Sequence, residues 1–247
     1  MDSDNFINTL SNWIAKSENT VFFGGAGVST ESGVPDFRSP TGIYARLGGA
    51  EEYLTLEFMN HHPKEFYAFY REYFMQGGIE PNPAHYKLAE MEQKNKLTAV
   101  VTQNVDGLHQ KAGSRRVLEL HGNGTRFYCQ QCGTPYSFDD VAEAEGPFIC
   151  RKKACGGLVR PDIVMYGESL AGDVLNQSID AIAKANLVIV GGSSMTVYPA
   201  AGLIHYRKKK SRLVLINLDA TPYDGVCDLV AHGPIGELLG GLEITSG

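Results

Sequence analysis

Short apolar runs alternate with longer stretches of mixed polarity along the chain, and this alternation predicts buried strands joined by helices and loops. Four of the runs lead into small or polar residues: Val21–Phe23, Leu97–Asn104, Leu187–Ser194 and Arg212–Asp219. Short, continuous apolar runs of this kind are typical of parallel strands that are covered on both faces. Because ligands of open parallel sheets bind at the carboxyl ends of strands, we expect the four polar tips to line one crevice.

Two further stretches show the spacing of helices. Phe6, Leu10, Trp13 and Ile14 fall on one face of residues 5–18, which predicts an amphipathic helix near the start of the chain. The stretch PKEFYAFYREYF, residues 63–74, predicts a second helix that carries several aromatic side chains.

Two interruptions are longer than a simple strand–helix–strand unit contains. The first separates the first two apolar runs, and the second, about residues 126–160, holds four of the five cysteines. We therefore expect an α/β fold, with a large parallel sheet covered by helices on both faces and a small inserted module. The predicted large domain comprises residues 1–40, 95–125 and 160–247, and the small domain combines a helical insertion, 41–94, with a cysteine module, 126–159.

Composition and charge narrow the possible partners. Hydrophobic residues make up 43% and charged residues 20% of the 247 positions, as in ordinary globular proteins. The net charge of −6 provides no basic surface for nucleic acid or an anionic membrane, and the short cluster Arg207–Lys210 fits a solvated helix end. No apolar run has the length of a membrane span, and the opening MDSDNF lacks the regions of a secretory signal. These features predict a cytoplasmic protein, a compartment in which disulfides are rare.

The cysteine spacing predicts a metal site. Cys129 and Cys132 form one close pair, and Cys150 and Cys155 form another after a 17-residue interval. Two such pairs suit one tetrahedral zinc ion held by four thiolates, and a closed set of four ligands leaves no open position for water. The alternative is four unrelated buried thiols. We therefore expect one structural zinc, with Cys227 as a small core residue.

The stretch GGAGVSTESGVPDFR, residues 24–38, resembles a dinucleotide-binding turn without being a standard one. An apolar strand precedes it, and the hydroxyls of Ser29 and Thr30 would lie near a helix start, where phosphate binds readily. The third glycine of the usual fingerprint is replaced by Thr30, and the acidic residue expected about twenty positions later is absent. A hydride-transfer dehydrogenase therefore fits poorly, while a tight turn without a ligand stays possible at this stage.

Polar residues follow the next two apolar stretches as well. The segment TQNVDGLHQKAG places Gln103, Asn104, Asp106 and His109 after the second run, where they could bind a polar ligand, although Asp106 could instead cap a helix. His121 follows the short apolar stretch 117–120. A single histidine is more often structural than catalytic, so neither histidine alone identifies an active site.

Taken together, these residues closely resemble the sirtuin family of NAD-dependent protein deacylases, in its prokaryotic type. The resemblance rests on GAGVSTESGVPDFR, TQNVDGLHQKAG, LELHGN, the two cysteine pairs, RPDIVMYGE, GGSSMTVYPAA and INLD, which occur in family order over nearly the whole chain. Each motif is weak evidence by itself, but the ordered set is highly specific. It implies a Rossmann-like domain joined to a zinc-and-helix module, with NAD and the acylated lysine entering between them.

The resemblance also implies roles for individual residues. Those expected to contact NAD are Ala26 and Thr30 at the phosphate turn, Phe37 and Arg38 over the nicotinamide ribose, Gln103 on that ribose, Asn104, Val105 and Asp106 around the carboxamide, Ser193 and Ser194 on phosphate or ribose, Asn217 on the adenosine ribose, and Ile235 near the adenine. Those expected to flank the acyl-lysine are Val164, Tyr166 and Val197. Tyr166 stands where the family usually has phenylalanine.

The activity implied is NAD-dependent deacetylation of protein lysines. Acetyl moves from acetyl-lysine to ADP-ribose, and free lysine, nicotinamide and O-acetyl-ADP-ribose are the products. His121 is the expected general base, since an imidazole titrates near working pH, and Asn104 is the expected second catalytic residue. The alternatives are removal of another acyl group, ADP-ribosyl transfer, a noncatalytic NAD and zinc binding module, or a zinc-ribbon nucleic-acid binder. The acidic charge disfavours nucleic acid, and the presence of His121, Asn104 and Asp106 disfavours an inactive module.

One departure from a family pattern bears on the acyl group. Members that prefer succinyl or malonyl lysine resemble one another in a Tyr-x-x-Arg pair on the helix after the first insertion. Aligning residues 63–74 with that helix puts Tyr70 at the tyrosine and Tyr73 at the arginine position. Arg71 follows Tyr70 directly and should project about 100° away around the helix. We therefore expect neutral acyl groups to be preferred, with acetyl first.

Overall fold

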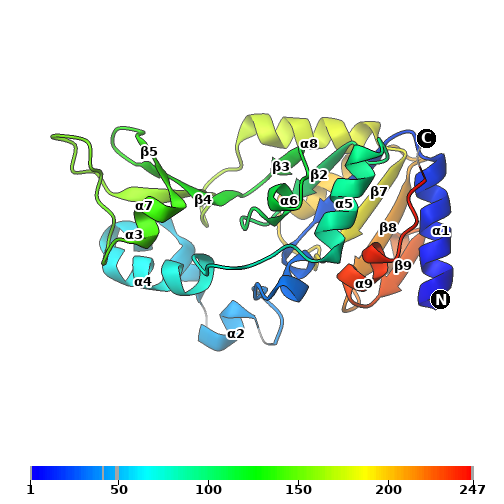
Figure 1. The fold of residues 1–247 in the computed structure, drawn as a ribbon, viewed down its shortest axis with the longest axis horizontal. Coiled ribbons are helices and arrows are strands. Elements are labelled where there is room, and N and C mark those ends of the chain that lie inside the picture. Colours follow the sequence, from blue (N-terminus) through cyan, green and yellow to red (C-terminus); the bar gives the residue numbers. More distant parts are fainter. Residues whose placement is uncertain (1, 41, 48–49, 246–247) are drawn as a thin grey trace.

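The computed structural model describes residues 2–40, 42–47 and 50–245, and Figure 1 shows two sheets lying toward opposite ends of the molecule. Within the described residues, six strands form the larger sheet in the order β3-β2-β1-β7-β8-β9. All neighbouring strands run parallel. Their bounds are β1 Thr20–Gly24, β2 Ala99–Thr102, β3 Val117–Glu119, β7 Leu187–Gly191, β8 Arg212–Asn217 and β9 Leu229–His232.

The four predicted strands correspond to β1, β2, β7 and β8, and the α/β fold class is confirmed. Each is buried along most or all of its length, as expected for strands covered on both sides. The chain adds β2 and β3 on one side of β1 and then β7, β8 and β9 on the other. The order therefore reverses between β1 and β7, and such a switch point is where open parallel sheets bind ligands.

Helices cover both faces of this sheet (Figure 1). On one face lie α1 Ser3–Lys16, α5 Pro83–Gln93 and α9 Ile235–Gly240, which share a hydrophobic cluster with the sheet. On the other lie α8 Gly172–Lys184 and a 3₁₀ helix, Ala200–Tyr206, which share a second cluster. The predicted helix near the start of the chain is present, and it buries Phe6, Leu10 and Ile14 while Trp13 is partly buried.

The smaller sheet is antiparallel and has the strand order β5-β4-β6 among the described residues. Its strands are β4 Gly122–Cys129, β5 Pro135–Ser137 and β6 Val159–Ile163. The helices of this part are α2 Ile43–Leu47, α3 Leu56–His61, α4 Pro63–Phe74 and α7 Phe138–Ala142, with a 3₁₀ helix at 50–54. The predicted helix over residues 63–74 is thus found with the same bounds, and it buries Phe66, Tyr67, Phe69 and Tyr70 in a third hydrophobic cluster.

One helix of the predicted insertion packs with the large sheet. Ala84, Leu88 and Met91 of α5 belong to the same buried cluster as α1 and α9. The division of the chain at residues 40, 94, 125 and 159 stays a prediction.

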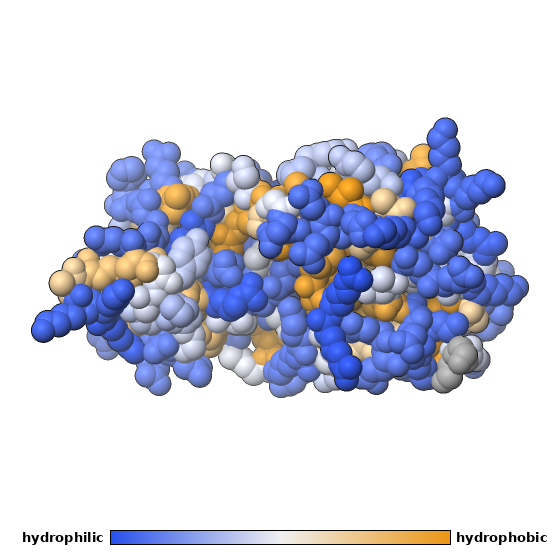
Figure 2. Space-filling model, turned by 90° about the horizontal axis from the view of Figure 1, so that it is seen from above, coloured by the Kyte–Doolittle hydropathy of each residue, from blue (hydrophilic) through white to orange (hydrophobic). Residues whose placement is uncertain are grey.

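Polar residues cover most of the face in Figure 2, and hydrophobic ones show mainly near its middle. Of the residues described, none belongs to a helix long and apolar enough to cross a membrane.

Candidate active site at the carboxyl ends of the strands

The glycine turn after β1 packs directly against the tip of β7. The Gly25 N–H donates to the Gly191 carbonyl (3.1 Å), and the Gly27 N–H donates to the Gly192 carbonyl (2.8 Å). A Cβ atom on Gly27 would lie 2.8 Å from the Gly192 Cα, and Gly192 itself has φ of +57°. Only glycine fits such a close approach of two backbones. The turn is therefore fixed by its interlock with the neighbouring strand.

The residues after this turn form two short 3₁₀ helices, Ala26–Val28 and Thr30–Ser32. The Thr30 hydroxyl donates to the Gly27 carbonyl (3.0 Å), so the residue that replaces the usual third glycine stabilises the turn. Thr30 is exposed and Ala26 is half-buried, and each begins one of the two 3₁₀ helices.

A buried polar network joins this turn to the segment after β2. Ser29 is fully buried, and its hydroxyl donates to Asp106 Oδ2 (2.7 Å) while accepting from Asn104 Nδ2 (3.0 Å). The other Asp106 oxygen accepts from the Leu108 N–H (2.9 Å) at the start of α6, Leu108–Lys111. Burial raises the pKa of Asp106. The expectation that the Ser29 hydroxyl faces a phosphate is wrong, because this hydroxyl points into the network. Asp106 both caps α6 and orients the Ser29 hydroxyl.

Two buried histidines lie beneath this network. His85 Nδ1 accepts from the Asn82 N–H (3.3 Å), so its proton sits on Nε2, which lies 3.5 Å from the Ser29 hydroxyl. The ring of His109 lies 4.8 Å from that of His85, and it is 1% exposed. Burial lowers the pKa of His85 to about 4 and that of His109 to about 3. His109 is therefore a neutral core residue, and His85 is a network member that the sequence alone did not indicate.

His121 lies just before β4, beside the same strand tips. Its Nδ1 lies 2.9 Å from the Gln103 carbonyl, and a carbonyl only accepts, so Nδ1 carries the proton. Nε2 is then left with a free lone pair. Burial is the main cause that lowers the pKa of His121, and the charge of Arg38 lowers it further. The neutral imidazole that a general base requires is thus the favoured form near pH 7.

The remaining strand tips come together as predicted. Gln103 Nε2 donates to the Ser193 hydroxyl (3.2 Å), which links the ends of β2 and β7. Ser194 is exposed beside it, and its hydroxyl lies 2.8 Å from that of Thr196. Asn217 ends β8, and its side chain donates to the Asp219 carbonyl (2.7 Å). The carboxyl ends of β1, β2, β7 and β8 therefore present their polar groups on the same side of the sheet, where the strands end.

Other predicted residues lie around these strand ends. Ile235 is buried at the start of α9, so only its backbone could meet a ligand there. Val105 is half-buried, and its carbonyl accepts from the Gly124 N–H (2.7 Å). The Val164 N–H donates to the His121 carbonyl (2.9 Å), which places the segment after β6 beside the histidine. Val197 is half-buried in the loop that follows β7.

The segment after the 3₁₀ helices carries an aromatic ring and a cation. The Phe37 ring packs against Tyr44 of α2 (5.6 Å between centroids) and Phe74 of α4 (6.0 Å). Arg38 Nη2 donates to the Tyr166 hydroxyl (3.1 Å). A cavity of about 500 Å³ lies alongside, lined by Thr30, by residues 33–36, by Glu72 and Tyr73 of α4, and by Gln76 just after that helix. This segment therefore bridges the large sheet and the small part.

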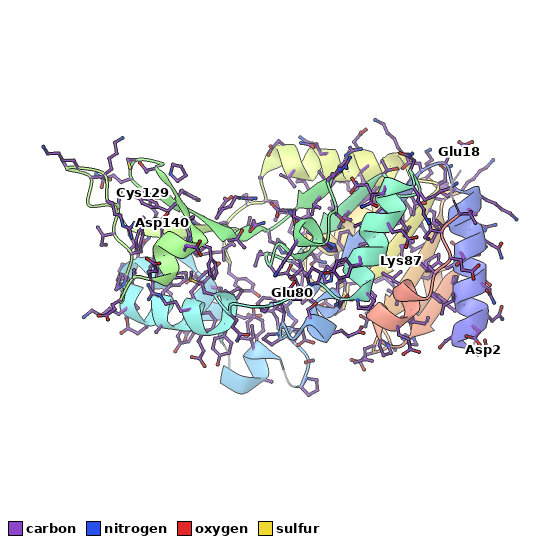
Figure 3. All side chains as sticks on the ribbon, viewed as in Figure 1. Asp2, Glu18, Glu80, Lys87, Cys129 and Asp140 are labelled. Atoms are coloured by element: carbon purple, nitrogen blue, oxygen red, sulfur yellow. The ribbon has the colours of Figure 1, made fainter. Side chains whose placement is uncertain are left out.

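The four predicted cysteines converge in the small part, where Figure 3 places Cys129. Their sulfur atoms all lie within 4.8 Å of one another, with Cys129 and Cys155 at 3.6 Å and Cys132 and Cys150 also at 3.6 Å. Tetrahedral zinc with bonds near 2.3 Å separates its sulfurs by about 3.8 Å. The arrangement fits one zinc ion.

Comparison with known proteins gives a consistent result. A family model described as the Sir2 family matches residues 25–199. A protein named NAD-dependent protein deacetylase from Clostridium perfringens (strain 13 / Type A) is 47% identical over 241 residues, which cover 96% of this chain and 98% of that protein. A protein of the same name from Thermotoga maritima is 43% identical, with 87% of each chain covered.

Solved structures agree closely with the fold. A complex of Sir2 with a p53 peptide and NAD⁺ has a TM-score of 0.84 and 39% identity, covering 97% of this chain and 96% of that one. A complex of a Sir2 variant with a deacetylated p53 peptide and 3′-O-acetyl ADP ribose has a TM-score of 0.87 and 38% identity, covering 96% and 99%.

Proposed function

Because the chain belongs to the Sir2 family, we propose that the residues at the strand tips bind NAD and that His121 is the general base of an NAD-dependent protein deacetylase. The protein removes acetyl groups from protein lysines and consumes NAD, which supplies the ADP-ribose that accepts the acetyl group. The products are free lysine, nicotinamide and O-acetyl-ADP-ribose. The observation that best supports the role of His121 is its hydrogen bond to the Gln103 carbonyl, which leaves Nε2 able to accept a proton.

The proposed NAD-binding residues divide by strand tip. Those after β1 are Ala26, Thr30, Phe37 and Arg38; those after β2 are Gln103, Asn104, Val105 and Asp106; and those toward the adenosine end are Ser193, Ser194, Asn217 and Ile235. Their placement around the switch point of the sheet supports these roles. His121 completes the set from the small sheet's side.

The hydrogen-bond network gives Asn104 a defined orientation. Its Nδ2 donates to the buried Ser29 hydroxyl, whose own proton is held by Asp106. The amide oxygen of Asn104 is therefore the atom free to accept a hydrogen bond in the reaction.

A general base must be neutral to accept the ribose hydroxyl proton. The burial that lowers the pKa of His121 keeps its imidazole neutral at pH 7.

The acetylated lysine is proposed to lie beside Val164, Tyr166 and Val197. The Val164 N–H binds the His121 carbonyl, so the segment that would flank the lysine is attached to the base itself. Acetylated proteins or peptides are the partners, in agreement with the peptide complexes of the structural relatives. The acidic net charge supports no direct role for nucleic acid.

The zinc ion is structural. We propose that Cys129, Cys132, Cys150 and Cys155 bind it, since four thiolates fill a tetrahedral site and leave no position for a reacting water. We also propose that the small domain is made of 41–94 and 126–159. We propose a cytoplasmic location as well, which is supported because none of the five cysteines, all within the described residues, forms a disulfide.

The proposed roles of His121 and Asn104 are tested by replacing each with alanine. Both side chains are half-buried at the strand tips, so the variants should fold. We expect NAD-dependent deacetylation of an acetyl-lysine peptide to fall by about 10²–10⁴-fold in each, the usual cost of losing a general base or an equivalent group. His205→Ala, on an exposed histidine away from the network, is the matched control. Near-wild-type turnover by His121→Ala would remove the central residue assignment.

A further inference from the structure

A cluster of hydroxyls and a guanidinium connects the segment after the glycine turn to the small part. The Tyr166 hydroxyl lies 2.5 Å from the Tyr44 hydroxyl and 3.1 Å from Arg38 Nη2. Arg38 also lies over the Tyr44 ring at 5.5 Å and 3.6 Å from Glu51. Since a guanidinium only donates, the Tyr166 oxygen accepts from Arg38. One tyrosine hydroxyl thus holds two residues from a segment more than one hundred positions earlier in the chain.

The backbone that carries Tyr166 is firmly held. Its N–H donates to the Leu54 carbonyl (2.9 Å), and the Met165 N–H donates to a Glu168 carboxylate oxygen (2.9 Å). That carboxylate makes two 2.7 Å hydrogen bonds to Arg160, which is 5% exposed. A paired carboxylate and guanidinium in this geometry is among the stronger side-chain interactions. Tyr166 therefore stands on a rigid support.

The segment it holds is largely folded on itself. We call residues Asp36–Pro40 and Gly42–Tyr44 the covering segment. The Ile43 N–H donates to the Asp36 carbonyl (2.8 Å), and the Tyr44 N–H donates to the Phe37 carbonyl (3.0 Å). A Cβ on Gly42 would collide with Asp36. The segment is thus a closed loop that can keep its own shape, and Tyr166 is one of the contacts that set its position relative to the sheet.

We propose that the Tyr166 hydroxyl is a positioning group that holds Arg38 and the covering segment over the NAD site before NAD binds. The proposal rests on the proposed function, in which Phe37 and Arg38 cover the nicotinamide ribose. A loop that is ordered in advance loses less conformational freedom when its ligand binds, and the saving appears as tighter binding. Phenylalanine, usual at this position in the family, would fill the same space and leave Arg38 without this acceptor.

The isosteric variant Tyr166→Phe isolates the hydroxyl. We expect the Kd for NAD, measured by calorimetry without peptide, to rise about 3–10-fold, as for loss of one ordinary hydrogen bond, because the Arg38 side chain is 40% exposed to solvent. Because Tyr166 is also proposed to flank the acetylated lysine, the KM for peptide is measured separately at saturating NAD, and the change in the Kd for NAD should be the larger of the two. Amide exchange in the covering segment of the free protein should become faster, which reports on the loop independently of catalysis.

Three further variants complete the test. Tyr44→Phe should raise the Kd for NAD by a similar factor. The double variant Tyr44→Phe/Tyr166→Phe should have a Kd no higher than either single variant, because each single change already removes the hydrogen-bonded arrangement. Tyr86→Phe, on an exposed tyrosine of α5, should change nothing. The inference is overturned if Tyr166→Phe leaves both the Kd for NAD and the exchange rates unchanged, or alters only the KM for peptide. Failure of the wild-type protein to bind NAD would instead refute the proposed function.

Discussion

Two clusters of polar side chains within the described residues, one beside the strand tips and one in the small part, are held together in different ways. Beside the strand tips, Ser29, His85 and His109 are buried and Asp106 is half-buried. Ser29, His85 and Asp106 are hydrogen-bonded within the protein. In the small part, four thiols lie within 4.8 Å of one another, an arrangement that is favourable as thiolates only with a cation between them. Both parts have a packed hydrophobic cluster, but the thiols of the small part also need a cation, whereas the active-site network is satisfied by its own hydrogen bonds.

Zinc removal should produce the largest effect and separate the two parts. We expect chelation, or Cys150→Ser, to unfold the small part and abolish deacetylation, since a structural zinc site contributes roughly 10 kcal/mol or more to folding. Trp13, the one tryptophan of the chain, packs on the large sheet, so its fluorescence should stay native. Cys227→Ser, outside the cluster, is the control. A simultaneous loss of the Trp13 signal would show that the two parts form one cooperative unit.

The choice of acyl group should show the next largest effect. Arg71 Nη2 donates to the carbonyls of Gly146 (2.6 Å) and Val141 (3.4 Å), and burial lowers the pKa of this guanidinium. These hydrogen bonds tie the Arg71 guanidinium to the small part. Tyr70, the tyrosine of the aligned pair, is 1% exposed. Because an unpaired buried carboxylate costs several kcal/mol, we expect kcat/KM for an acetyl peptide to exceed that for its succinyl form by about 10²-fold or more.

The comparison uses one peptide sequence carrying acetyl, propionyl or succinyl on the same lysine. Propionyl, which is neutral, should be accepted much better than succinyl and serves as the control for size. A preference for succinyl would show that the helix alignment, or the inference drawn from Arg71, is wrong.

Acid should produce a smaller effect, and it should begin in the large sheet's polar network. The pKa values of His85 and His109 in the folded protein, about 4 and about 3, lie below the 6.5 of an unfolded histidine. The unfolded chain therefore binds more protons below pH 6.5, so stability is complete above that pH and declines as the pH falls toward 4. Between pH 7 and pH 5 we expect a loss of roughly 4 kcal/mol, about 2 kcal/mol from each histidine, in the Trp13-monitored unfolding free energy.

The variant His109→Leu sharpens this expectation. Neither ring nitrogen of His109 has a hydrogen-bond partner among the described residues, so an apolar side chain of similar size should be tolerated. It should reduce the pH dependence by about half, because one of two similar groups no longer titrates. An unchanged pH dependence would place the titrating groups elsewhere.

Much of the fold followed from local patterns in the sequence. The four apolar runs that lead into small or polar residues are the central strands, because strands buried on both faces need continuous apolar residues. The short strands β3 and β9 were not predicted, since three or four residues at the edges of the sheet carry little pattern. The cysteine spacing predicted the metal cluster, because knuckle spacing is a local property.

The parts that the sequence could not reveal depend on contacts between distant residues. The hydroxyl of Ser29 could face a phosphate or the protein, and only the positions of Asn104 and Asp106, more than seventy residues away, decide between them. His85 lies three positions after Asn82, the N-cap residue of α5. A role in capping that helix is enough to account for a histidine there, so the sequence does not indicate its contact with Ser29. The contact between Arg38 and Tyr166 spans 128 positions. Local pattern carries no information on such pairings.

The most direct test of the central claim is the fate of the acetyl group. The wild-type protein is incubated with NAD and a peptide whose acetyl-lysine carries an isotopic label, and the products are separated by mass. The account predicts one nicotinamide and one labelled O-acetyl-ADP-ribose for each lysine freed, with no deacetylation when NAD is omitted. Release of labelled acetate without NAD consumption, or ADP-ribose attached to the peptide, would contradict it.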